Sequence, residues 1–376
     1  MLAGDVELAA WLRLIHWPGL GREALRRLLS AFGSPQAVVD APHSARLAVV
    51  GTRSAMSPLP HERDAEHLAS TEHWLAGSPM RCLLTLGEPA YPALLLETAD
   101  PPVWLFAEGR LELLDTPSLA IVGSRQATPQ GRQNARDLSG NLARQGWTIV
   151  SGLASGIDAA AHEGALAAGG NTLAVVGTGL DLVYPRSHQA LARRIVAHGL
   201  MVSEFPLGTP PLPQNFPMRN RIIATLSRGT LVVEAAPQSG SLITARLAAE
   251  AGREVFAVPG SIHSPQSRGC HELLKQGAKL VQTAEDVLEE LSVGPVPGPG
   301  AAPNVAGPQD EPRRAPSATE RDPVLRALGH DPATLDELMS RCGWPAHELN
   351  ARLLEFELTG EVARLPGGRF QRIQRA

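Results

Sequence analysis

Short apolar runs alternate with amphipathic stretches through the middle of the chain. Each run is followed by polar or small residues and then by a stretch with apolar positions three and four residues apart. Continuous apolar strands that alternate with helices are typical of a parallel sheet covered on both faces. We therefore expect an α/β fold with a Rossmann-like domain over residues 76–290. The expected strands are 103–106, 119–122, 148–150, 173–176, 201–203, 231–233 and 255–258.

Helical periodicity on the N-terminal side of this region predicts a separate helical domain over residues 1–75. Residues 6–16 and 21–32 repeat apolar positions at helical spacing, and a Pro-Gly-x-Gly turn joins them. The turn resembles those of helix-hairpin-helix and sterile-alpha-motif modules, which contact DNA backbones or other proteins. A plain helical hairpin explains it equally well.

The C-terminal side predicts a linker and a winged helix. Residues 291–320 are rich in Pro, Gly and Ala, a composition that buries too little apolar surface to order itself. Residues 321–376 then contain three short amphipathic stretches and a hairpin pattern. Their eight arginines are balanced by eight acidic residues. A module without basic excess favours a protein contact or a regulatory role over DNA binding.

Composition narrows the class of protein. The net charge is −4, and 43% of the residues are hydrophobic. No apolar run approaches the ~20 residues of a membrane-spanning helix, and no signal peptide is expected at the N-terminus. The three cysteines, Cys82, Cys270 and Cys342, are too few and too scattered for a disulfide framework or a zinc site, so we expect a cytoplasmic protein.

Four loops that follow expected strands are suited to anions. Small residues let backbone N–H groups approach a phosphate, and ligands of open parallel sheets bind beyond the carboxyl ends of the strands. The residues expected to contact the anion from these loops are Gly123, Ser124, Arg125, Ser151, Gly152, Arg186, Ser239, Gly240 and Ser241.

A fifth segment adds cations and an aromatic ring. Arg219, Asn220 and Arg221 follow Phe216 and are expected ahead of a short apolar helix. Phe216 is a candidate platform for a base, because aromatic stacking tolerates every base; core packing is the equal alternative. The chain has no P-loop lysine, no dinucleotide fingerprint in its proper place and no metal-ligand cluster. The sequence thus predicts a groove that grips several phosphates, without cofactor or metal.

These motifs, taken in order, closely resemble those of the bacterial DNA-processing protein A family, DprA, also called Smf. The resemblance covers residues 80–285, and the helical and winged modules on either side also resemble arrangements in that family. The segments that carry it are 123–125, 151–158, 177–181, 203–206, 216–224, 233–235, 239–245 and 253–260.

The resemblance implies a non-enzymatic protein that binds incoming single-stranded DNA during natural transformation and recombination. Such proteins load the RecA recombinase, displace or cooperate with single-strand-binding protein, and form homodimers. Ser124, Arg125, Arg219 and Arg221 would then hold backbone phosphate, and Asn220 would orient the loop. The dimer and recombinase contacts would lie within 262–278. The residues expected there are Ile262, His271, Leu273 and Leu274.

Two departures from the family pattern affect details of the groove and the dimer. His271 and His188 stand where many relatives carry Asn. The serious rival is a nucleotide phosphoribohydrolase on the same sheet, because Glu204 and Glu234 follow strands as catalytic carboxylates would. A structural scaffold is the third hypothesis. Asp158 and His162 resemble an acid–base pair, but we expect them to orient neighbouring loops.

Overall fold

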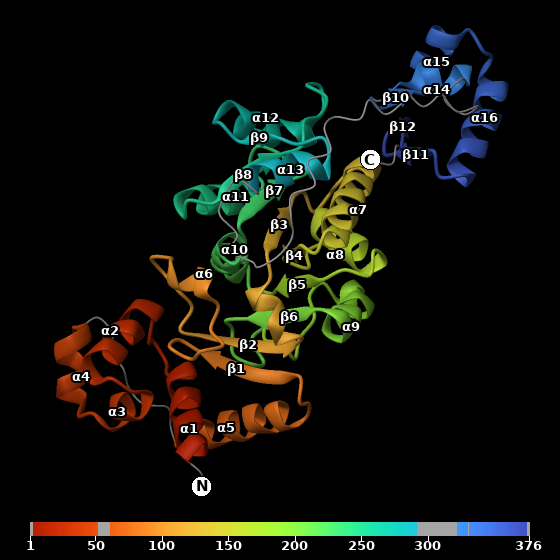
Figure 1. Ribbon diagram of the computed structural model, residues 1–376. Coiled ribbons are helices and arrows are strands. Elements are labelled where there is room, and N and C mark those ends of the chain that lie inside the picture. Colours follow the sequence, from red (N-terminus) through yellow and green to blue (C-terminus); the bar gives the residue numbers. More distant parts are fainter. Residues whose placement is uncertain (1–2, 52–60, 292–321, 330, 374–376) are drawn as a thin grey trace, which may run out of the picture.

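The computed structural model describes residues 3–51, 61–291, 322–329 and 331–373. The predicted fold class is confirmed: a mostly parallel sheet is accompanied by N-terminal helices and a C-terminal winged helix (Figure 1). The expected linker at 291–320 lies almost wholly outside the described residues. None of the helices in the described part of the chain is long and apolar enough to cross a membrane.

In the described part of the chain, nine strands form the central sheet, in the order β1-β2-β6-β5-β4-β3-β7-β8-β9. All neighbours from β6 to β9 pair in parallel, whereas β2 pairs antiparallel with both β6 and β1. The strands are β1 (Arg81–Thr85), β2 (Trp104–Gly109), β3 (Ser118–Val122), β4 (Thr148–Ser151), β5 (Thr172–Val175), β6 (Leu200–Ser203), β7 (Gly229–Val232), β8 (Glu254–Ala257) and β9 (Lys279–Leu280).

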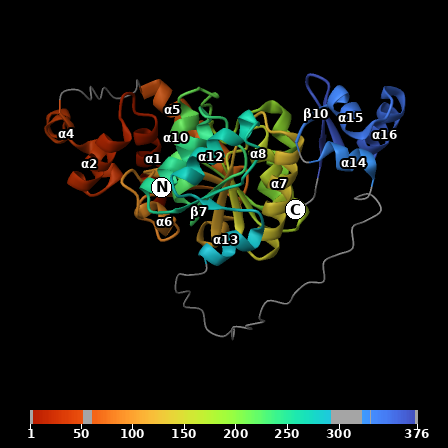
Figure 2. The same ribbon diagram turned by 90° about the horizontal axis from the view of Figure 1, so that it is seen from above.

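Helices cover both faces of the sheet, so every residue of its inner strands β3, β4, β5, β6 and β7 is buried. In the view from above, α10 and α12 lie toward one side and α7 and α8 toward the other (Figure 2). These helices are α6 (Ala93–Leu96), α7 (Pro129–Arg144), α8 (Ile157–Ala167), α9 (Gln189–His198), α10 (Asn215–Thr225), α11 (Gly240–Glu250), α12 (Arg268–Lys275) and α13 (Ala284–Leu291).

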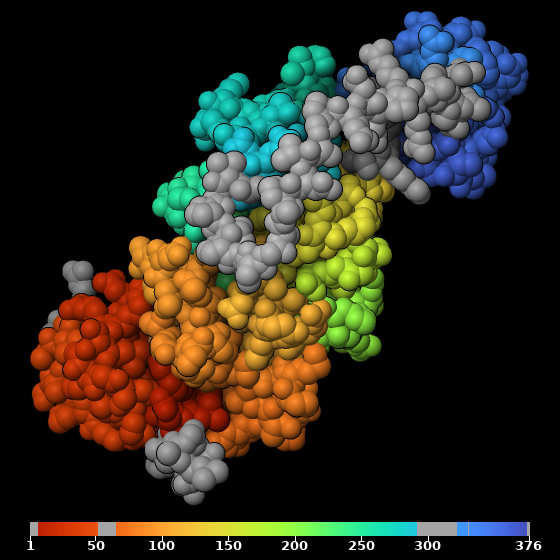
Figure 3. Space-filling view, in the orientation of Figure 1, coloured from red at the N-terminus to blue at the C-terminus, as the bar shows by residue number. Residues whose placement is uncertain are grey.

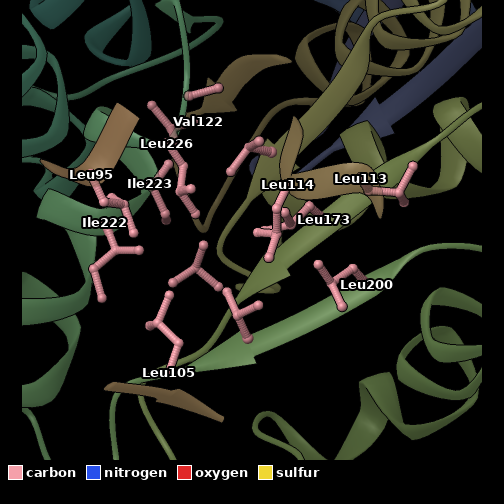
Figure 4. Close-up of a cluster of buried hydrophobic side chains, with 14 of the residues drawn as sticks. Leu95, Leu105, Leu113, Leu114, Val122, Leu173, Leu200, Ile222, Ile223 and Leu226 are labelled. Carbon is pink, nitrogen blue, oxygen red and sulfur yellow. The ribbon is translucent and has the colours of Figure 1, made fainter. Parts of the chain in front are cut away.

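Helix α10 is packed into the core on one side. Ile222, Ile223 and Leu226 belong to a buried cluster that also contains Leu95 of α6 and Leu105 of β2 (Figure 4). Burial of side chains of this size stabilises the fold by roughly 1.5–3 kcal/mol each. The C-terminal end of α10 is therefore anchored in the same core that holds the sheet.

The sequence prediction located the seven expected strands and differs from the structure in three respects. It assumed a wholly parallel sheet, although β2 runs antiparallel to its neighbours, and it missed β1 and β9. It also placed Arg219, Asn220 and Arg221 ahead of a helix, although all three lie inside α10. Pro217 marks the true start, because a helix accepts proline in its first turn, where the N–H has no intrahelical partner.

The helical domain packs directly against the sheet. Its Trp11 and Leu12 share a buried cluster with Trp104, Phe106 and Met201 of the sheet, so the two parts have a common apolar core. Figure 3 shows the N-terminal residues in close contact with the neighbouring segment of the sheet domain. The helices are α1 (Ala3–Ile15), α2 (Arg22–Phe32), α3 (Pro35–Asp40), α4 (His43–Val50) and α5 (His61–Ala76).

The winged helix has its own core. Leu325, Leu338, Leu353 and Phe370 are buried in it, and Thr334 begins its second helix with a capping box. The elements are α14 (Pro323–Leu328), β10 (Ala333–Thr334), α15 (Leu335–Cys342), α16 (Ala346–Leu358), β11 (Val362–Leu365) and β12 (Arg369–Arg372).

Candidate nucleic-acid interface

An open groove of about 700 Å³ lies at the carboxyl ends of β3 and β7. Its walls come from the loop after β3, from α10 and from the start of α11. This is the edge at which open parallel sheets bind ligands. Nine of the predicted residues line it: Gly123, Ser124, Arg125, Phe216, Arg219, Asn220, Ser239, Gly240 and Ser241.

The loop after β3 is held close to the end of β7. Ser124 N–H donates to the Glu234 carbonyl at 2.7 Å. A Cβ on Gly123 would lie 2.8 Å from that same carbonyl, so only glycine permits the approach. The Glu234 carboxylate accepts from Thr128 N (2.9 Å) and Thr128 Oγ1 (2.6 Å) and so fixes the start of α7. Arg125 follows on this rigid loop and is exposed to solvent.

Arg219 supplies a buried positive charge to the groove. Its side chain donates from Nη2 to the Gly152 carbonyl at 2.9 Å, and the residue is 4% exposed. Burial lowers the pKa of Arg219 to about 10, against the opposing attraction of Asp158. The guanidinium thus stays charged at neutral pH. Asp158 Oδ2 also accepts from Gly152 N (3.1 Å) and Ala154 N (3.3 Å), which agrees with the expectation that it orients the loop.

Aromatic rings meet the cations at one end of the groove. The Arg125 guanidinium lies 5.1 Å from the centre of the Phe216 ring. Tyr184, which is 46% exposed, lies 5.6 Å from the same ring at 43°. The two rings, Arg125 and Arg219 also border a small cavity of about 70 Å³. Phe216 is therefore at the surface of the groove, and the Tyr184 ring beside it was not among the sequence candidates.

The third wall is the N-terminus of α11. Ser239 begins the helix, and its Oγ accepts from Ser241 N at 3.3 Å. Asn220 Nδ2 donates to the Gly240 carbonyl at 3.3 Å and so ties α10 to this turn. Free N–H groups and the helix dipole make such an end favourable for anions.

Four predicted contact residues lie outside this groove. Ser151 is buried and donates from Oγ to the Ile121 carbonyl at 2.6 Å. Gly152 borders only the small cavity, and Arg186 lies exposed in a 3₁₀ turn (Arg186–His188) that does not line the groove. Arg221 points to Asp100 and Glu204, on another side of α10. Helical spacing places Arg221 about 200° around the α10 axis from Arg219. Because both arginines were expected ahead of the helix, the sequence did not show that they point in different directions.

The residues expected at the dimer interface differ in exposure. Ile262 is 75% exposed, and a His271 ring nitrogen lies 3.0 Å from the Gly260 carbonyl. Leu273 is buried and Leu274 is partly buried against the sheet. Next to them a cavity of about 450 Å³ opens between α11 and α12. Its apolar lining includes Leu242, Ile243, Val255 and Leu273.

The carboxylates that suggested hydrolysis have structural partners. Glu204 is paired with Arg22 and Arg221, and Glu234 caps α7 through Thr128. His162 does not serve Asp158 as a proton partner, because its Nδ1 bonds to Thr172 Oγ1 at 2.7 Å. Over the described ranges, no group of three or more His, Cys, Asp or Glu residues could hold a metal ion.

Comparison with known proteins identifies the family. A family model for DNA recombination-mediator protein A matches residues 82–292, the whole of the groove included. The chain belongs to the DprA/Smf family. A second model, for the DprA winged helix domain, matches residues 308–368.

DprA/Smf relatives resemble the chain over most of its length. Protein Smf of Escherichia coli (strain K12) is 41% identical over 372 residues, which are 99% of this chain and 97% of that protein. DNA processing protein DprA of Streptococcus pneumoniae (strain ATCC BAA-255 / R6) is 50% identical over 201 residues, 54% of this chain and 71% of that one. The family and its recombination-mediator class are thus shown for this chain.

Two solved DprA structures resemble it as well. DNA processing protein A from Streptococcus pneumoniae has a TM-score of 0.64 and 38% identity, over 77% of this chain and 99% of that one. The protein from Helicobacter pylori, described with a unique single-stranded DNA binding mode, has a TM-score of 0.51 and 33% identity, over 56% of this chain and 95% of that one.

Proposed function

We propose that this DprA/Smf protein binds single-stranded DNA in the groove between the β3 loop, α10 and the start of α11. The observation that carries the proposal is the combination of two cations with an accessible ring. Arg219 is charged and fixed by Gly152, and Arg125 is exposed beside Phe216. Cations track a phosphate backbone, whereas a ring stacks on any base, so binding is independent of sequence.

The proposed role is that of a recombination mediator in natural transformation and recombinational repair. The protein would protect incoming strands, displace or cooperate with single-strand-binding protein, and load RecA in the cytoplasm. Family membership supports this role. The single-stranded DNA binding described for the Helicobacter pylori protein supports the choice of ligand.

We propose that the protein binds DNA without catalysing a reaction. A glycosidic-bond hydrolase requires a pair of carboxylates free to act on a substrate. Glu204 and Glu234 are engaged with arginines and with Thr128, and Asp158 holds the backbone of its own loop. A groove of about 700 Å³ with cations from two elements also suits a strand better than one mononucleotide.

The experiment is fluorescence anisotropy with labelled single-stranded and double-stranded oligonucleotides over a salt series. We expect salt-dependent, sequence-independent binding to single strands. Arg125→Ala should weaken binding to every sequence and reduce the slope of log K against log salt by about 0.7, the contribution of one phosphate contact in a single strand. Arg193→Ala, an exposed arginine on α9 outside the groove, is the matched control.

Absence of binding at low salt, or an Arg125→Ala variant indistinguishable from wild type, would contradict the proposal. Release of free base from nucleotides would establish the hydrolase instead.

We also propose a homodimer through the face that contains Ile262 and the cavity between α11 and α12. An exposed isoleucine beside an apolar cavity is the surface that supports it. Ile262→Glu should shift sedimentation equilibrium toward monomer and leave the unfolding midpoint unchanged, because Ile262 is not part of the core. Leu274 and His271 are the next residues to test, whereas Leu273 is too deeply buried for its substitution to be informative.

A further inference from the structure

Five charged side chains meet where the helical domain contacts the sheet domain. Arg22 and Arg26 come from α2, Asp100 from the segment before β2, Glu204 from the end of β6, and Arg221 from α10. Arg22 bonds to Asp100 at 3.1 Å and to Glu204 at 3.0 Å. Arg221 forms an ion pair with Asp100, 3.3 Å from Nε to Oδ2, and donates from Nη2 to both Glu204 oxygens. We call these five residues the junction cluster.

The junction cluster is more enclosed than an ordinary surface ion pair. The Glu204 side chain is 5% exposed and that of Arg221 is 13% exposed. Burial raises the pKa of Asp100, but Arg221, Arg26 and Arg22 outweigh it and hold the pKa below its usual value. Truncation of one partner of an enclosed pair leaves the other charge uncompensated, so loss of one side chain here is expected to disturb the elements that the cluster joins.

The cluster reaches the groove through one helix. Arg221 belongs to α10, whose Phe216, Arg219 and Asn220 line the groove. Because Arg219 and Arg221 point about 200° apart around the helix axis, Arg219 donates to the Gly152 carbonyl beside the groove while Arg221 pairs with Asp100 and Glu204 in the junction cluster. A shift of α10 at the junction must therefore move the groove-facing side chains as well.

Two further contacts make the junction a single unit. Trp104 Nε1 donates to the Glu204 carbonyl at 2.8 Å, and Arg221 Nη1 donates to the Asp100 carbonyl at 2.7 Å. Trp104 itself is part of the core that the sheet shares with Trp11 and Leu12 of the helical domain. The backbone on both sides of the cluster is thus fixed along with the side chains.

We propose that the helical domain sets the geometry of the DNA groove through this cluster, and that Arg22, Asp100, Glu204 and Arg221 are positioning residues for strand binding. The inference deepens the proposed function and rests on it. It assigns Arg221 a role without phosphate contact, in place of the phosphate contact that the family resemblance implied. The helical domain then becomes part of the DNA-binding unit rather than a separate appendage.

The test separates positioning from direct contact by the salt dependence of single-strand binding. Arg22→Gln and Arg221→Ala should each weaken affinity about three- to tenfold, as expected of a structural coupling, with an unchanged salt slope, because neither removes a phosphate contact. Arg125→Ala in the same series should reduce the slope. Arg22→Lys, which retains a charge at the junction, should recover part of the affinity.

The matched control is Arg81→Gln. Arg81 also forms a half-buried ion pair, with Glu108 at 2.7 Å, and donates to the Trp74 carbonyl of α5, but within the described residues it has no hydrogen bond or ion pair to α10. It should leave strand affinity unchanged. Arg22→Gln is the main variant because its side chain is 27% exposed, so the chain is expected to fold.

Three outcomes would overturn the inference: unchanged affinity in Arg22→Gln, a reduced slope in Arg221→Ala like that of Arg125→Ala, or an equal loss in Arg81→Gln. If wild type binds no strand at all, the proposed function fails instead. A double-mutant cycle of Arg22 and Arg221 on urea unfolding then tests the junction alone. Additive effects there would overturn the coupling, and interaction between the two would retain it.

Discussion

The Gly152 carbonyl accepts a hydrogen bond from the Arg219 guanidinium, which occupies the space that a side chain at position 152 would fill. Nη2 donates to the carbonyl at 2.9 Å, and a Cβ on Gly152 would lie 1.4 Å from Nη1. Leu153 next to it has a φ of 58°, which is strained for a side chain of that size. The β4–α8 loop is thus shaped to receive an arginine from α10. Arg219, a deeply buried cation of the groove, therefore depends on a residue without a side chain.

Gly152→Ala should therefore displace Arg219. We expect the free energy of unfolding to fall by about 1–3 kcal/mol, the usual cost of overpacking, and single-strand affinity to fall with it. Urea unfolding and anisotropy measure the two effects. Gly21→Ala is the control, because Gly21 has a φ of −73° and no atom within 4 Å of an added Cβ. Wild-type affinity in Gly152→Ala would show that Arg219 does not need this position.

Phe216→Leu should weaken single-strand binding without a change in salt dependence. Loss of base stacking costs ~1–3 kcal/mol, which is roughly a five- to 150-fold rise in Kd, whereas no charge is removed. Anisotropy over a salt series separates the two effects. Tyr184→Phe retains the neighbouring ring and should bind like wild type. If Phe216→Leu loses stability and keeps its affinity, the ring serves core packing and not the strand.

Stability should fall in acid in part because of His162. Burial, with Arg219 and His188 nearby, lowers the pKa of His162 to about 3. Thr172 Oγ1 donates to the Ile149 carbonyl at 2.8 Å, so it accepts from His162 Nδ1–H, and the neutral ring is held in one tautomer. The folded pKa lies below the unfolded value of about 6.5. The unfolded chain therefore binds the proton first as the pH falls.

The contribution of His162 is complete above pH ~6.5 and is lost toward pH ~3, at up to ~1.4 kcal/mol per pH unit. Urea unfolding at several pH values from 7.5 to 4.5 measures it. His162→Gln should unfold with a shallower pH dependence than wild type. Parallel pH curves for the two proteins would mean that another group carries the effect.

The winged helix should contribute little to nucleic-acid binding. Residues 321–376 have no basic excess to attract phosphate, and helix α16 exposes the apolar Leu354 (55%) and Leu358 (81%). In the full-length chain, Arg364→Ala combined with Arg369→Ala should leave single- and double-strand affinities and their salt slopes unchanged. A loss confined to double strands would show that the wing binds duplex DNA.

The sequence pattern was sufficient to predict helix starts, because these depend on residue types next to one another in the chain. Thr128 before Pro129 begins α7 and Ser239 begins α11, as the residue types predict. The antiparallel edge was not predictable in the same way. Whether β2 runs with or against β6 depends on the pairing of two segments that lie far apart in the sequence, and the alternation of apolar residues is the same in both directions.

Arg219 and Arg221, two residues apart in one motif, also show which features are local and which depend on tertiary contacts. The sequence by itself determined that two cations and an aromatic ring occur beside a Gly/Ser turn after a buried strand, because those residue types and that order are local properties. Only the tertiary structure decided which cation faces the groove. Helix α10 turns Arg219 toward the Gly152 carbonyl and Arg221 toward Asp100 and Glu204, because these partners come from distant segments of the sequence that only folding brings to α10.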